Sequence, residues 1–395
     1  MKKKILLLTP YYPCPAHDGG KVRIFNLIKA LSKDNDIVLL SYVESPAVPE
    51  RYNVYLEQYC TRIYTVVRDE SKRLLDANIP RSPTFYYTPE MVHMLEKAVE
   101  ESKPNIVQIE FLIMTQYVNH IKNLPVIYTE HDMSSIDFEQ SFHDRDMPEK
   151  LRFAAWVELV KYQKQILGKF SGIVLLTERD KHQLEQFSPG LRTAVVPTGV
   201  DIHYYSPSAE KRVKNSNIVF VGHFKHYPNV DAVQYFMKDI WRLILEKVAD
   251  AKFYIVGSGA GEAIRKFSAT NVVIAEDVED VRVYLHDAAV FVAPVRLGGG
   301  IKGKVLEAMA CGVPVVAIPD VCAGFENHPG DDILKASGER DFADQVIRIL
   351  RNPAEGARLA ENARRLVEGK YDWDNIAREL SLFYGSFLNG KARKI

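Results

Sequence analysis

The chain has 395 residues, which is too long for one hydrophobic core of ordinary size and predicts two domains. Lys plus Arg and Asp plus Glu both total 51, so the net charge is zero, which argues against bulk binding of nucleic acid by a strongly basic domain. The four cysteines have no CxxC spacing, which indicates reduced thiols rather than a zinc site or a disulfide framework. These cysteines are Cys14, Cys60, Cys311 and Cys322.

The first predicted element is a buried strand over residues 4–9. Lysines precede this apolar run, as in an export signal, but the run ends at Thr9-Pro10, short of the roughly 7–15 apolar residues that such a signal needs. No segment approaches the roughly 18 consecutive apolar residues of a membrane span. We therefore expect a cytoplasmic protein whose contact with a membrane, if it has one, is peripheral and on the inner face of the plasma membrane.

Gly19 and Gly20 follow a long loop and stand where the next predicted helix, residues 21–33, begins. Glycines at a helix start let backbone amides come close to a diphosphate or to an acceptor. They can equally serve only to close the loop. Two glycines do not decide between these two interpretations.

Further apolar runs of strand length follow in the first half of the chain, at residues 36–43, 62–67, 105–110, 124–132 and 172–177. The run 124–132 ends in Glu130, His131 and Asp132, where the site of an α/β protein would lie. The imidazole of His131 could contact a sugar hydroxyl or relay a proton. A metal ligand and a local hydrogen bond are the alternatives, although no further ligand follows at a helpful spacing.

The middle of the chain contains a long predicted helix and then a linker. The helix covers residues 148–170, and its basic residues could meet anionic lipid, although its mixed charge favours a solvated face. Residues 71–90, rich in proline and aromatic residues, could form an exposed loop near an acceptor. Residues 198–216 are polar, which is typical of a linker and predicts domains over 1–205 and 214–372.

A second alternating pattern begins with predicted strands at residues 217–222 and 251–257. The turn at 256–261, VGSGAG, is a weak phosphate signal on its own. A dehydrogenase would have such a turn after the first strand of the domain, with an acidic residue about 20 positions on. Here the turn follows the second strand and the fingerprint is incomplete.

Residues 289–318 form the most informative stretch: an apolar strand, a loop rich in glycine and cations, a helix and another strand. Continuous apolar strands predict a parallel sheet, which binds ligands at its C-terminal edge. In the loop, Arg296, Lys302 and Lys304 accompany three glycines and the start of the helix, which together suit a diphosphate. Glu307 lies one turn beyond Lys304 and could accept from ribose hydroxyls; alternatively the two form a solvated surface pair.

The motif K-x-LEAMA-x-G-PVV, present here as Lys304 and residues 306–316, resembles the nucleotide-sugar site of the family 4 retaining glycosyltransferases. These enzymes have the GT-B fold. Many relatives carry a Glu that contacts the donor sugar eight positions before Glu307, where this chain has Gly299. The chain is similar to a subgroup in which an RLGGG-type loop replaces that carboxylate and Arg296 contacts phosphate.

The resemblance implies an α/β protein of the GT-B fold, with two Rossmann-like αβα domains facing each other across a cleft. Residues 1–205, completed by a C-terminal helix over 374–390, would bind the acceptor, and residues 214–372 would bind the donor. Glu307 would hold the donor ribose and His131 would contact the donor sugar. The other donor-binding positions that it implies are Gly19, Gly20, Lys225, the backbone at Val278, Gly299 and Gly300.

The function that the resemblance implies is a retaining hexosyltransferase. It would move a sugar from a UDP or GDP sugar to a glycan or polyprenyl-linked acceptor, in the synthesis of a bacterial surface polysaccharide such as lipopolysaccharide. Arg296 and Lys304 would stabilise the leaving diphosphate, so no metal ion or other cofactor is expected. The alternatives are a noncatalytic GT-B protein that binds a nucleotide sugar or scaffolds partners, a sugar-nucleotide epimerase and a phosphorylase.

Overall fold

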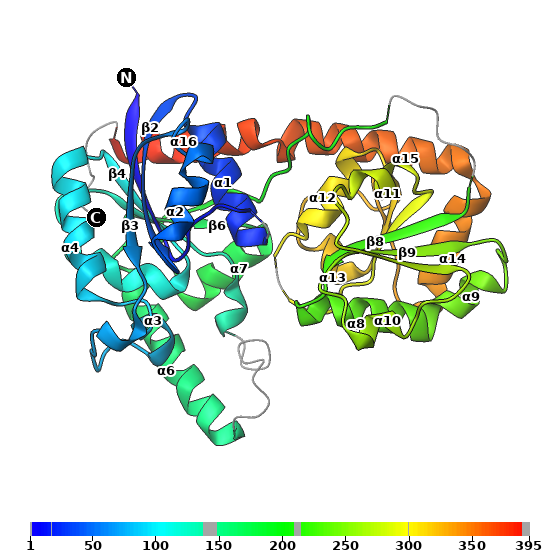
Figure 1. Ribbon diagram of the computed structural model, residues 1–395, viewed down its shortest axis with the longest axis horizontal. Helices are drawn as coiled ribbons and strands as arrows, with labels where there is room; N and C mark the ends of the chain where they lie inside the picture. Colours follow the sequence, from blue (N-terminus) through cyan, green and yellow to red (C-terminus); the bar gives the residue numbers. More distant parts are fainter. Residues whose placement is uncertain (1, 17, 137–147, 209–214, 299, 389–395) are drawn as a thin grey trace. The chain divides into compact units, whose positions relative to one another are not determined.

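The computed structural model describes residues 2–16, 18–136, 148–208, 215–298 and 300–388. The chain divides into two compact units. Unit 1 comprises Met1–Pro197 together with Trp373–Ile395, and unit 2 comprises Thr198–Asp372. Each unit is built around its own parallel sheet (Figure 1).

Unit 1 contains a seven-stranded parallel sheet in the order β3-β2-β1-β4-β5-β6-β7. Along β1, Leu6 and Leu8 belong to one buried cluster and Ile5 and Leu7 to another, so both faces of the sheet are covered. The strands are β1 (Lys3–Thr9), β2 (Asn35–Val43), β3 (Cys60–Val67), β4 (Ile106–Glu110), β5 (Val126–Thr129), β6 (Gly172–Leu175) and β7 (Thr193–Val195).

The helices of unit 1 follow the strands, and side chains cap several of them. Asp18, Thr88 and Thr177 each accept a hydrogen bond from a backbone amide in the first turn of the helix that follows. The α-helices are α1 (Gly19–Leu31), α2 (Ala47–Tyr52), α3 (Arg81–Thr84), α4 (Pro89–Ser102), α6 (Glu149–Leu167), α7 (Glu178–Phe187) and α16 (Trp373–Leu388). The 3-10 helices are η1 (Asn53–Tyr55), η2 (Glu70–Lys72), η3 (Leu112–His120) and η4 (Met133–Ile136).

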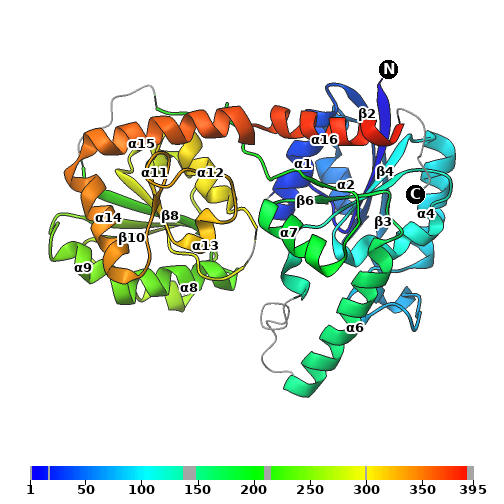
Figure 2. The same cartoon turned by 180° about the vertical axis from the view of Figure 1, so that it is seen from behind.

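The last helix, α16, packs beside α1 in unit 1, as both ribbon views show (Figure 1, Figure 2). Lys33, just beyond α1, forms an ion pair with Asp374 at 2.6 Å. Trp373, Ile376 and Leu380 are buried in the same cluster as the residues of α1. The chain therefore returns to unit 1 after completing unit 2.

Unit 2 contains a six-stranded parallel sheet in the order β10-β9-β8-β11-β12-β13. The strands are β8 (Asn217–His223), β9 (Lys252–Ser258), β10 (Val272–Glu276), β11 (Val290–Ala293), β12 (Val315–Ala317) and β13 (Leu334–Lys335). The helices are α8 (Tyr227–Tyr235), the π-helix η5 (Phe236–Ile240), α9 (Trp241–Leu245), α10 (Glu262–Arg265), α11 (Arg282–His286), α12 (Gly303–Ala310), α13 (Pro319–Cys322), α14 (Glu339–Arg351), α15 (Pro353–Leu366) and the π-helix η6 (Val367–Tyr371). This parallel α/β architecture agrees with the fold class expected from the sequence.

The sequence places the end of the first domain at residue 205, whereas the structure divides the chain after Pro197. The connecting residues belong to unit 2 because unit 2 binds their backbone. The Val200 amide donates to the Tyr371 carbonyl at 2.8 Å, and Arg364 donates to the carbonyls of Ile202 and Tyr205 at 3.0 and 2.7 Å. The predicted boundary at 214 and the end of the predicted helix 374–390 lie outside the described residues.

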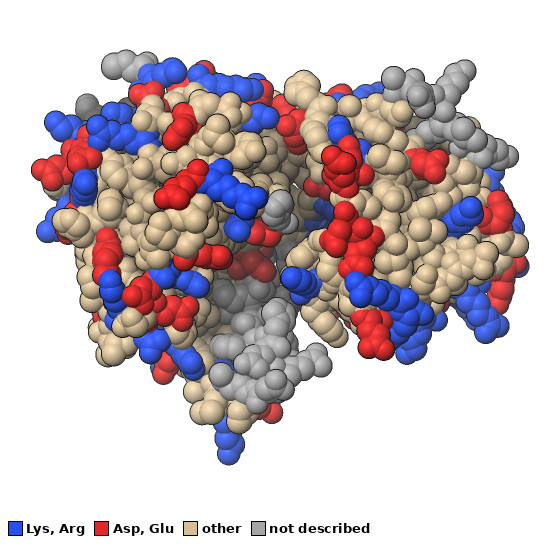
Figure 3. Space-filling model, viewed as in Figure 1, with Lys and Arg blue, Asp and Glu red and all other residues tan. Residues whose placement is uncertain are grey.

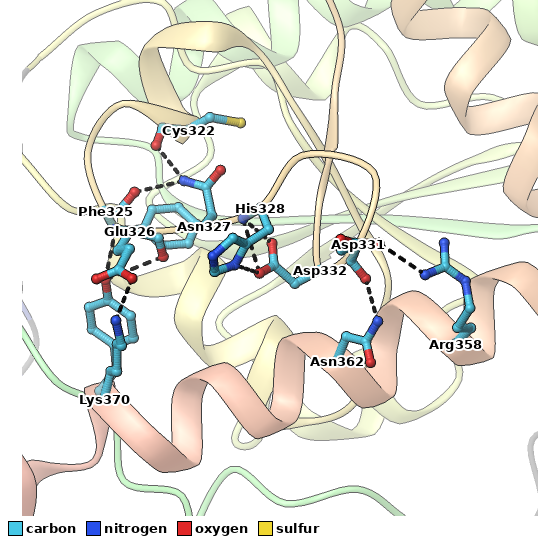
Figure 4. A network of polar contacts seen from close by, with 11 residues as sticks. Cys322, Phe325, Glu326, Asn327, His328, Asp331, Asp332, Arg358, Asn362 and Lys370 are labelled. Atoms are coloured by element: carbon cyan, nitrogen blue, oxygen red, sulfur yellow. Dashed lines mark hydrogen bonds and ion pairs between the residues drawn. The ribbon is translucent and has the colours of Figure 1, made fainter.

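A network of polar contacts holds the segment between α13 and β13 (Figure 4). The Asp332 carboxylate accepts from the backbone amide of His328 at 2.8 and 3.0 Å. Arg358 and Asn362, both on α15, donate to the carbonyls of Gly330 and Asp331 at 2.9 and 2.8 Å. This segment is therefore fastened to α15.

On the face that Figure 3 shows, basic and acidic side chains are interspersed over both units. Within the described ranges, no helix combines the length and the apolar character needed to span a bilayer.

Candidate functional site

The strand order of unit 2 reverses between β8 and β11, and the loops that follow these two strands carry most of the predicted donor-site residues. Ligands of parallel α/β sheets bind at such a reversal, beyond the carboxyl ends of the strands. Arg296 lies in the loop after β11, and Lys304 and Glu307 lie on α12, which follows that loop. Asn229 and Asp231 lie on α8, which follows β8.

The loop before α12 uses glycine for its backbone conformation. Gly298 and Gly300 have φ angles of 81° and 68°, in the left-handed region that favours glycine. Lys302 Nζ donates to the carbonyl of Gly298 at 2.7 Å and so closes the loop upon itself. The predicted residue Gly299 lies outside the described residues.

Gly324 packs against the backbone of the glycine loop. It lies in the segment between α13 and β13 that the network of Figure 4 holds. A Cβ atom at position 324 would lie 2.8 Å from the carbonyl oxygen of Gly300, closer than real Cβ contacts come. The two backbones approach each other because position 324 has no side chain. The position of the glycine loop therefore depends on the segment after α13.

The side chain of Lys304 is partly buried and contacts residues of β8 and α8. Its Nζ donates to Oδ1 of Asn229 and lies 4.5 Å from the centre of the Phe220 ring. Burial, and then the positive charge of Lys302, lower the pKa of Lys304 to about 7, although Glu307 acts in the opposite direction. An anion bound beside this ammonium group would favour its charged form.

Arg296 is paired with Asp231 by two parallel hydrogen bonds. Its Nη2 donates to Oδ1 at 2.7 Å and its Nε donates to Oδ2 at 3.2 Å. The guanidinium also lies 4.3 Å from the centre of the Tyr235 ring. The hydrogen bonds to Asp231 raise the pKa of Arg296, so the group stays charged.

Glu307 accepts a hydrogen bond from the hydroxyl group of Tyr205. Burial raises the pKa of Glu307 to about 6, and Lys304 and the Tyr205 hydroxyl oppose this shift. Burial and the charge of Glu307 raise the pKa of Tyr205, which remains a donor. Lys304 and Glu307 are both partly buried and each has a partner from another segment, Asn229 and Tyr205, so they are not a fully solvated surface pair.

The other two predicted donor-site positions of unit 2 lie at the same edge of its sheet. Lys225 follows β8 and is exposed, and its Cγ lies beside Gly259 in the glycine-rich turn after β9. Val278 follows β10 and packs on the core of the unit. The structure thus brings the loops after β8, β10 and β11 to one edge.

His131, the predicted site residue of unit 1, follows β5 and is bound by a carboxylate from the neighbouring strand β4. Its Nε2 lies 2.6 Å from Oε2 of Glu110. Burial lowers the pKa of His131, and the hydrogen bond to Glu110 opposes this shift. Burial alone would raise the pKa of Glu110, but His131 and Arg23 bring it below its ordinary value, so Glu110 is ionised.

Phe111 stacks on the imidazole of His131, with ring centres 3.6 Å apart and an angle of 10° between the planes. Its φ angle is 70°, an unusual value for a residue with a side chain and one that is concentrated at functional sites. Glu110 and Phe111 were not predicted from the sequence as site residues. The available signal was a carboxylate at the C-terminal end of a buried strand.

Gly19 and Gly20 lie in the first turn of α1, two residues before the predicted start of that helix. A Cβ atom at Gly20 would lie 1.9 Å from the Tyr11 hydroxyl oxygen and 2.9 Å from Cζ of Phe111. At Gly19 nothing lies within 4 Å of such an atom. Gly20 therefore has a packing role beside Phe111 and His131, and Gly19 is the glycine with open space around it.

Unit 1 also contains a cavity of about 410 Å³ at the carboxyl ends of β1, β2 and β3. Its wall combines aromatic rings with basic and acidic side chains: Tyr11, Tyr12, Tyr42, Tyr52, Lys21, Arg68, Asp18 and Glu44. In the part of the chain that the structure describes, no group of three or more His, Cys, Asp or Glu side chains is arranged to hold a metal ion.

Comparison with known protein families agrees with this architecture. Residues 17–204 match the model of glycosyltransferase family 4, and residues 215–352 match the model of glycosyl transferases group 1. Together the two glycosyltransferase models match most of the chain, which is therefore a glycosyltransferase. Between them, the two matches include His131 in unit 1 and Arg296, Lys304 and Glu307 in unit 2.

Relatives of this glycosyltransferase match it over almost the whole chain. A protein of the Klebsiella pneumoniae cps region, described as an uncharacterized 44.6 kDa protein, is 22% identical over 385 residues, 93% of this chain and 96% of the relative. Sucrose-phosphate synthase from Thermosynechococcus elongatus is 17% identical with a TM-score of 0.75, over 98% of this chain and 100% of that structure. The Anabaena protein Alr3699/HepE, solved in complex with UDP, is 14% identical with a TM-score of 0.67, over 98% and 100%. These structural likenesses confirm the GT-B fold.

Proposed function

We propose that this glycosyltransferase is a retaining hexosyltransferase that uses a nucleoside-diphosphate sugar. The observation that carries the proposal is the convergence of Arg296, Lys304 and Glu307 where the strand order of unit 2 reverses. Two cations, a left-handed glycine loop and the amino end of α12 suit a diphosphate. The Glu307 carboxylate, one turn along α12, suits the paired hydroxyls of a ribose.

In the reaction, the bond between the anomeric carbon and the diphosphate oxygen breaks, and a bond to the acceptor hydroxyl oxygen forms. Negative charge develops on the departing diphosphate, and Arg296 and Lys304 stabilise that charge. Retention follows from attack on the face from which the diphosphate leaves, so the hydroxyl proton passes to a diphosphate oxygen. Two cationic side chains perform the task that a divalent metal ion performs in other transferases, so the proposed reaction needs no metal.

His131 is proposed to contact the donor sugar through Nδ1. Because Glu110 is ionised, Nε2 of His131 carries the proton and donates to Oε2 at 2.6 Å. Since burial lowers the pKa of His131, the ring is neutral near pH 7 and Nδ1 is an acceptor. His131 then accepts a hydrogen bond from a sugar hydroxyl.

The acceptor is proposed to bind the aromatic cavity of unit 1. Tyrosine rings suit the apolar faces of a sugar, and Lys21 and Arg68 suit the phosphates of a polyprenyl-linked glycan. The relative from the cps region supports a role in a surface polysaccharide, such as capsule or lipopolysaccharide. The complex of Alr3699/HepE with UDP makes a UDP sugar the first donor to test, with a GDP sugar as the alternative.

The test is hydrolysis of the donor without an acceptor. The purified protein is incubated with UDP-glucose, UDP-N-acetylglucosamine or GDP-mannose in buffer with EDTA, and nucleotide release and the anomer formed first are followed by NMR. Slow release of UDP or GDP with the anomeric configuration of the donor supports the proposal. Release of the inverted anomer, or complete dependence on a metal ion, contradicts it.

The alternative that one observation favours is a noncatalytic GT-B protein, because position 299 is glycine where many relatives carry a glutamate. The same experiment separates the two functions. The noncatalytic protein would be favoured if the nucleotide binds but the donor is never cleaved, either with or without added lipid-linked glycans from cells. A changed sugar that remains attached to its nucleotide would instead reveal an epimerase.

A further inference from the structure

The two cations of the proposed diphosphate site are each bound by a side chain of the first turns of α8. Asn229 accepts from Lys304, and Asp231 accepts from Arg296. Two residues of α8 thus contact the two cations, Asn229 the lysine on α12 and Asp231 the arginine in the loop before it. We propose that Asn229 and Asp231 are positioning residues that orient Lys304 and Arg296 toward a bound diphosphate, an inference that rests on the proposed function.

The orientation of Asn229 is determined by its surroundings. Its Nδ2 donates to the carbonyl of His223 at 2.8 Å, so its Oδ1 faces Lys304. The residue is 8% exposed, and its side chain packs against Gly222, where a Cβ atom would lie 3.0 Å from Cγ of Asn229. An ammonium group can donate only to the amide oxygen, and the bond from Nδ2 to the His223 carbonyl keeps that oxygen turned toward Lys304.

Lys304 keeps donors for a ligand after this contact. An ammonium group has three N–H donors, and Asn229 takes one of them. Phe220 covers another side of the group, with the ring centre 4.5 Å from Nζ. Asn229 is neutral, so it directs the ammonium group without cancelling the charge that would attract phosphate.

Asp231 orients Arg296 in a complementary way. It binds the edge formed by Nε and Nη2, and Tyr235 lies against the face of the guanidinium. Among the described residues, no acceptor is bound to Nη1 of Arg296. The Arg296 side chain is 47% exposed and that of Asp231 is 14% exposed, so the carboxylate lies on the protein side of the pair. The remaining edge of the guanidinium is available to a phosphate.

If the ion pair between Arg296 and Asp231 were purely structural, the effects of mutation would differ. It would contribute to folding stability but not to the affinity for a nucleotide, and a half-exposed pair contributes little even to stability. A positioning residue acts through its cation, so its removal matters only while that cation is present. A double-mutant cycle measures this dependence directly.

The experiment titrates UDP and GDP in parallel into the full-length protein and into Asp231→Asn, Arg296→Met and the double variant, by calorimetry. Asp231→Asn preserves the shape of the side chain and is expected to weaken binding of the nucleotide about tenfold. In the Arg296→Met background the same change is expected to alter affinity less than twofold. Asp231→Glu, which keeps the carboxylate, is expected to recover most of the affinity.

Asp239 provides the matched control, because its charge also acts on Arg296 but no hydrogen bond joins the two side chains. Asp239→Asn is expected to change affinity less than twofold. A second cycle pairs Asn229→Ala with Lys304→Met and has the same expected pattern. Melting temperatures of all variants identify any that fold poorly, and those are replaced in the cycle by Asp231→Ser or Asn229→Ser.

Each outcome has a definite meaning. Equal losses in the wild-type and Arg296→Met backgrounds, or an unchanged affinity in Asp231→Asn, would overturn the positioning role while leaving the proposed function intact. An unchanged affinity in both Arg296→Met and Lys304→Met would overturn the diphosphate site itself. A wild-type protein that binds neither UDP nor GDP would contradict both.

Discussion

Nε2 of His131 lies 2.6 Å from Oε2 of Glu110, so a buried carboxylate determines which nitrogen of the imidazole carries the proton. Oε1 of the same carboxylate accepts from the Thr129 hydroxyl at 3.1 Å and from the Gln108 amide. Phe111 stacks on the imidazole ring of His131. The position and the tautomer of His131 are therefore determined before any substrate binds.

Replacing Glu110 by glutamine is expected to lower kcat for donor cleavage about tenfold, because an amide can either donate to or accept from Nε2 and no longer selects one tautomer. UDP affinity should not change, since UDP lacks the transferred sugar that is proposed to meet Nδ1. The matched control is Glu130→Gln. Glu130 accepts from the Tyr128 hydroxyl and the Gln163 amide rather than from His131, so its replacement should leave kcat within twofold. Equal losses in both variants would show that His131 does not depend on Glu110.

Donor binding is expected to depend on pH through Lys304 and Glu307. The pKa of Lys304 is lowered to about 7, so as pH rises above 7 Lys304 of the empty site loses its positive charge, and binding of the donor must return a proton to it. The pKa of Glu307 is raised to about 6, so as pH falls below 6 the carboxylate that accepts from ribose becomes protonated. Affinity should be highest between about pH 6 and 7 and fall by up to about tenfold per unit on either side.

The measurement uses a nucleotide sugar rather than UDP, because the terminal phosphate of UDP itself titrates near pH 6. Calorimetry in buffers of different ionisation enthalpy should show net proton uptake at pH 8 and none in Lys304→Met. An affinity that is constant from pH 5 to 9 would mean that neither side chain meets the donor.

Tyr205→Phe tests the contact between Tyr205 and Glu307. The Tyr205 hydroxyl lowers the pKa of Glu307, so its loss should raise that pKa and shift the acidic decline in donor affinity to higher pH. At pH 7 affinity should fall less than about threefold, since one neutral hydrogen bond is lost. Tyr204→Phe is the neighbouring control and should leave the profile unchanged. A profile of Tyr205→Phe that coincides with the wild type would refute a role for this hydroxyl.

Gly324→Ala is expected to destabilise unit 2 by about 1–3 kcal/mol, because a Cβ atom would lie 2.8 Å from the Gly300 carbonyl oxygen and the segment is tied to α15. The displaced glycine loop should also weaken UDP binding. Gly261→Ala, with nothing within 4 Å of the added atom, should change stability by less than about 0.5 kcal/mol. Denaturant unfolding measures the stability of both variants. Equal stabilities would show that the glycine loop does not depend on the segment that contains Gly324.

The fold could be predicted because its determinants are local. Continuous apolar runs such as residues 36–43 predict buried parallel strands, and the structure forms β2 there. The loop at 296–304 also carried its own signal, since glycines and cations before a helix indicate an anion site.

Contacts between distant segments could not be predicted. Glu110 and His131 meet because β4 and β5 are neighbours with Glu110 opposite Thr129, and no local pattern gives that register. Tyr205 and Glu307 are separated by about a hundred residues, and so the sequence showed only an aromatic residue in a linker. The role of Gly20 also needed the structure, because its packing partner Phe111 comes from another strand end.

The most direct test of the donor site is a thermal-shift comparison of the wild type and Glu307→Ala with UDP, GDP, dTDP, ADP and CMP, and with NAD as a control. A ligand that binds only the folded state raises the melting temperature. We predict that one nucleoside diphosphate stabilises the wild type and that Glu307→Ala, folded to the same melting temperature without ligand, loses most of that shift. Stabilisation by NAD alone, or an equal shift in both proteins, would contradict the assignment of the donor site to unit 2.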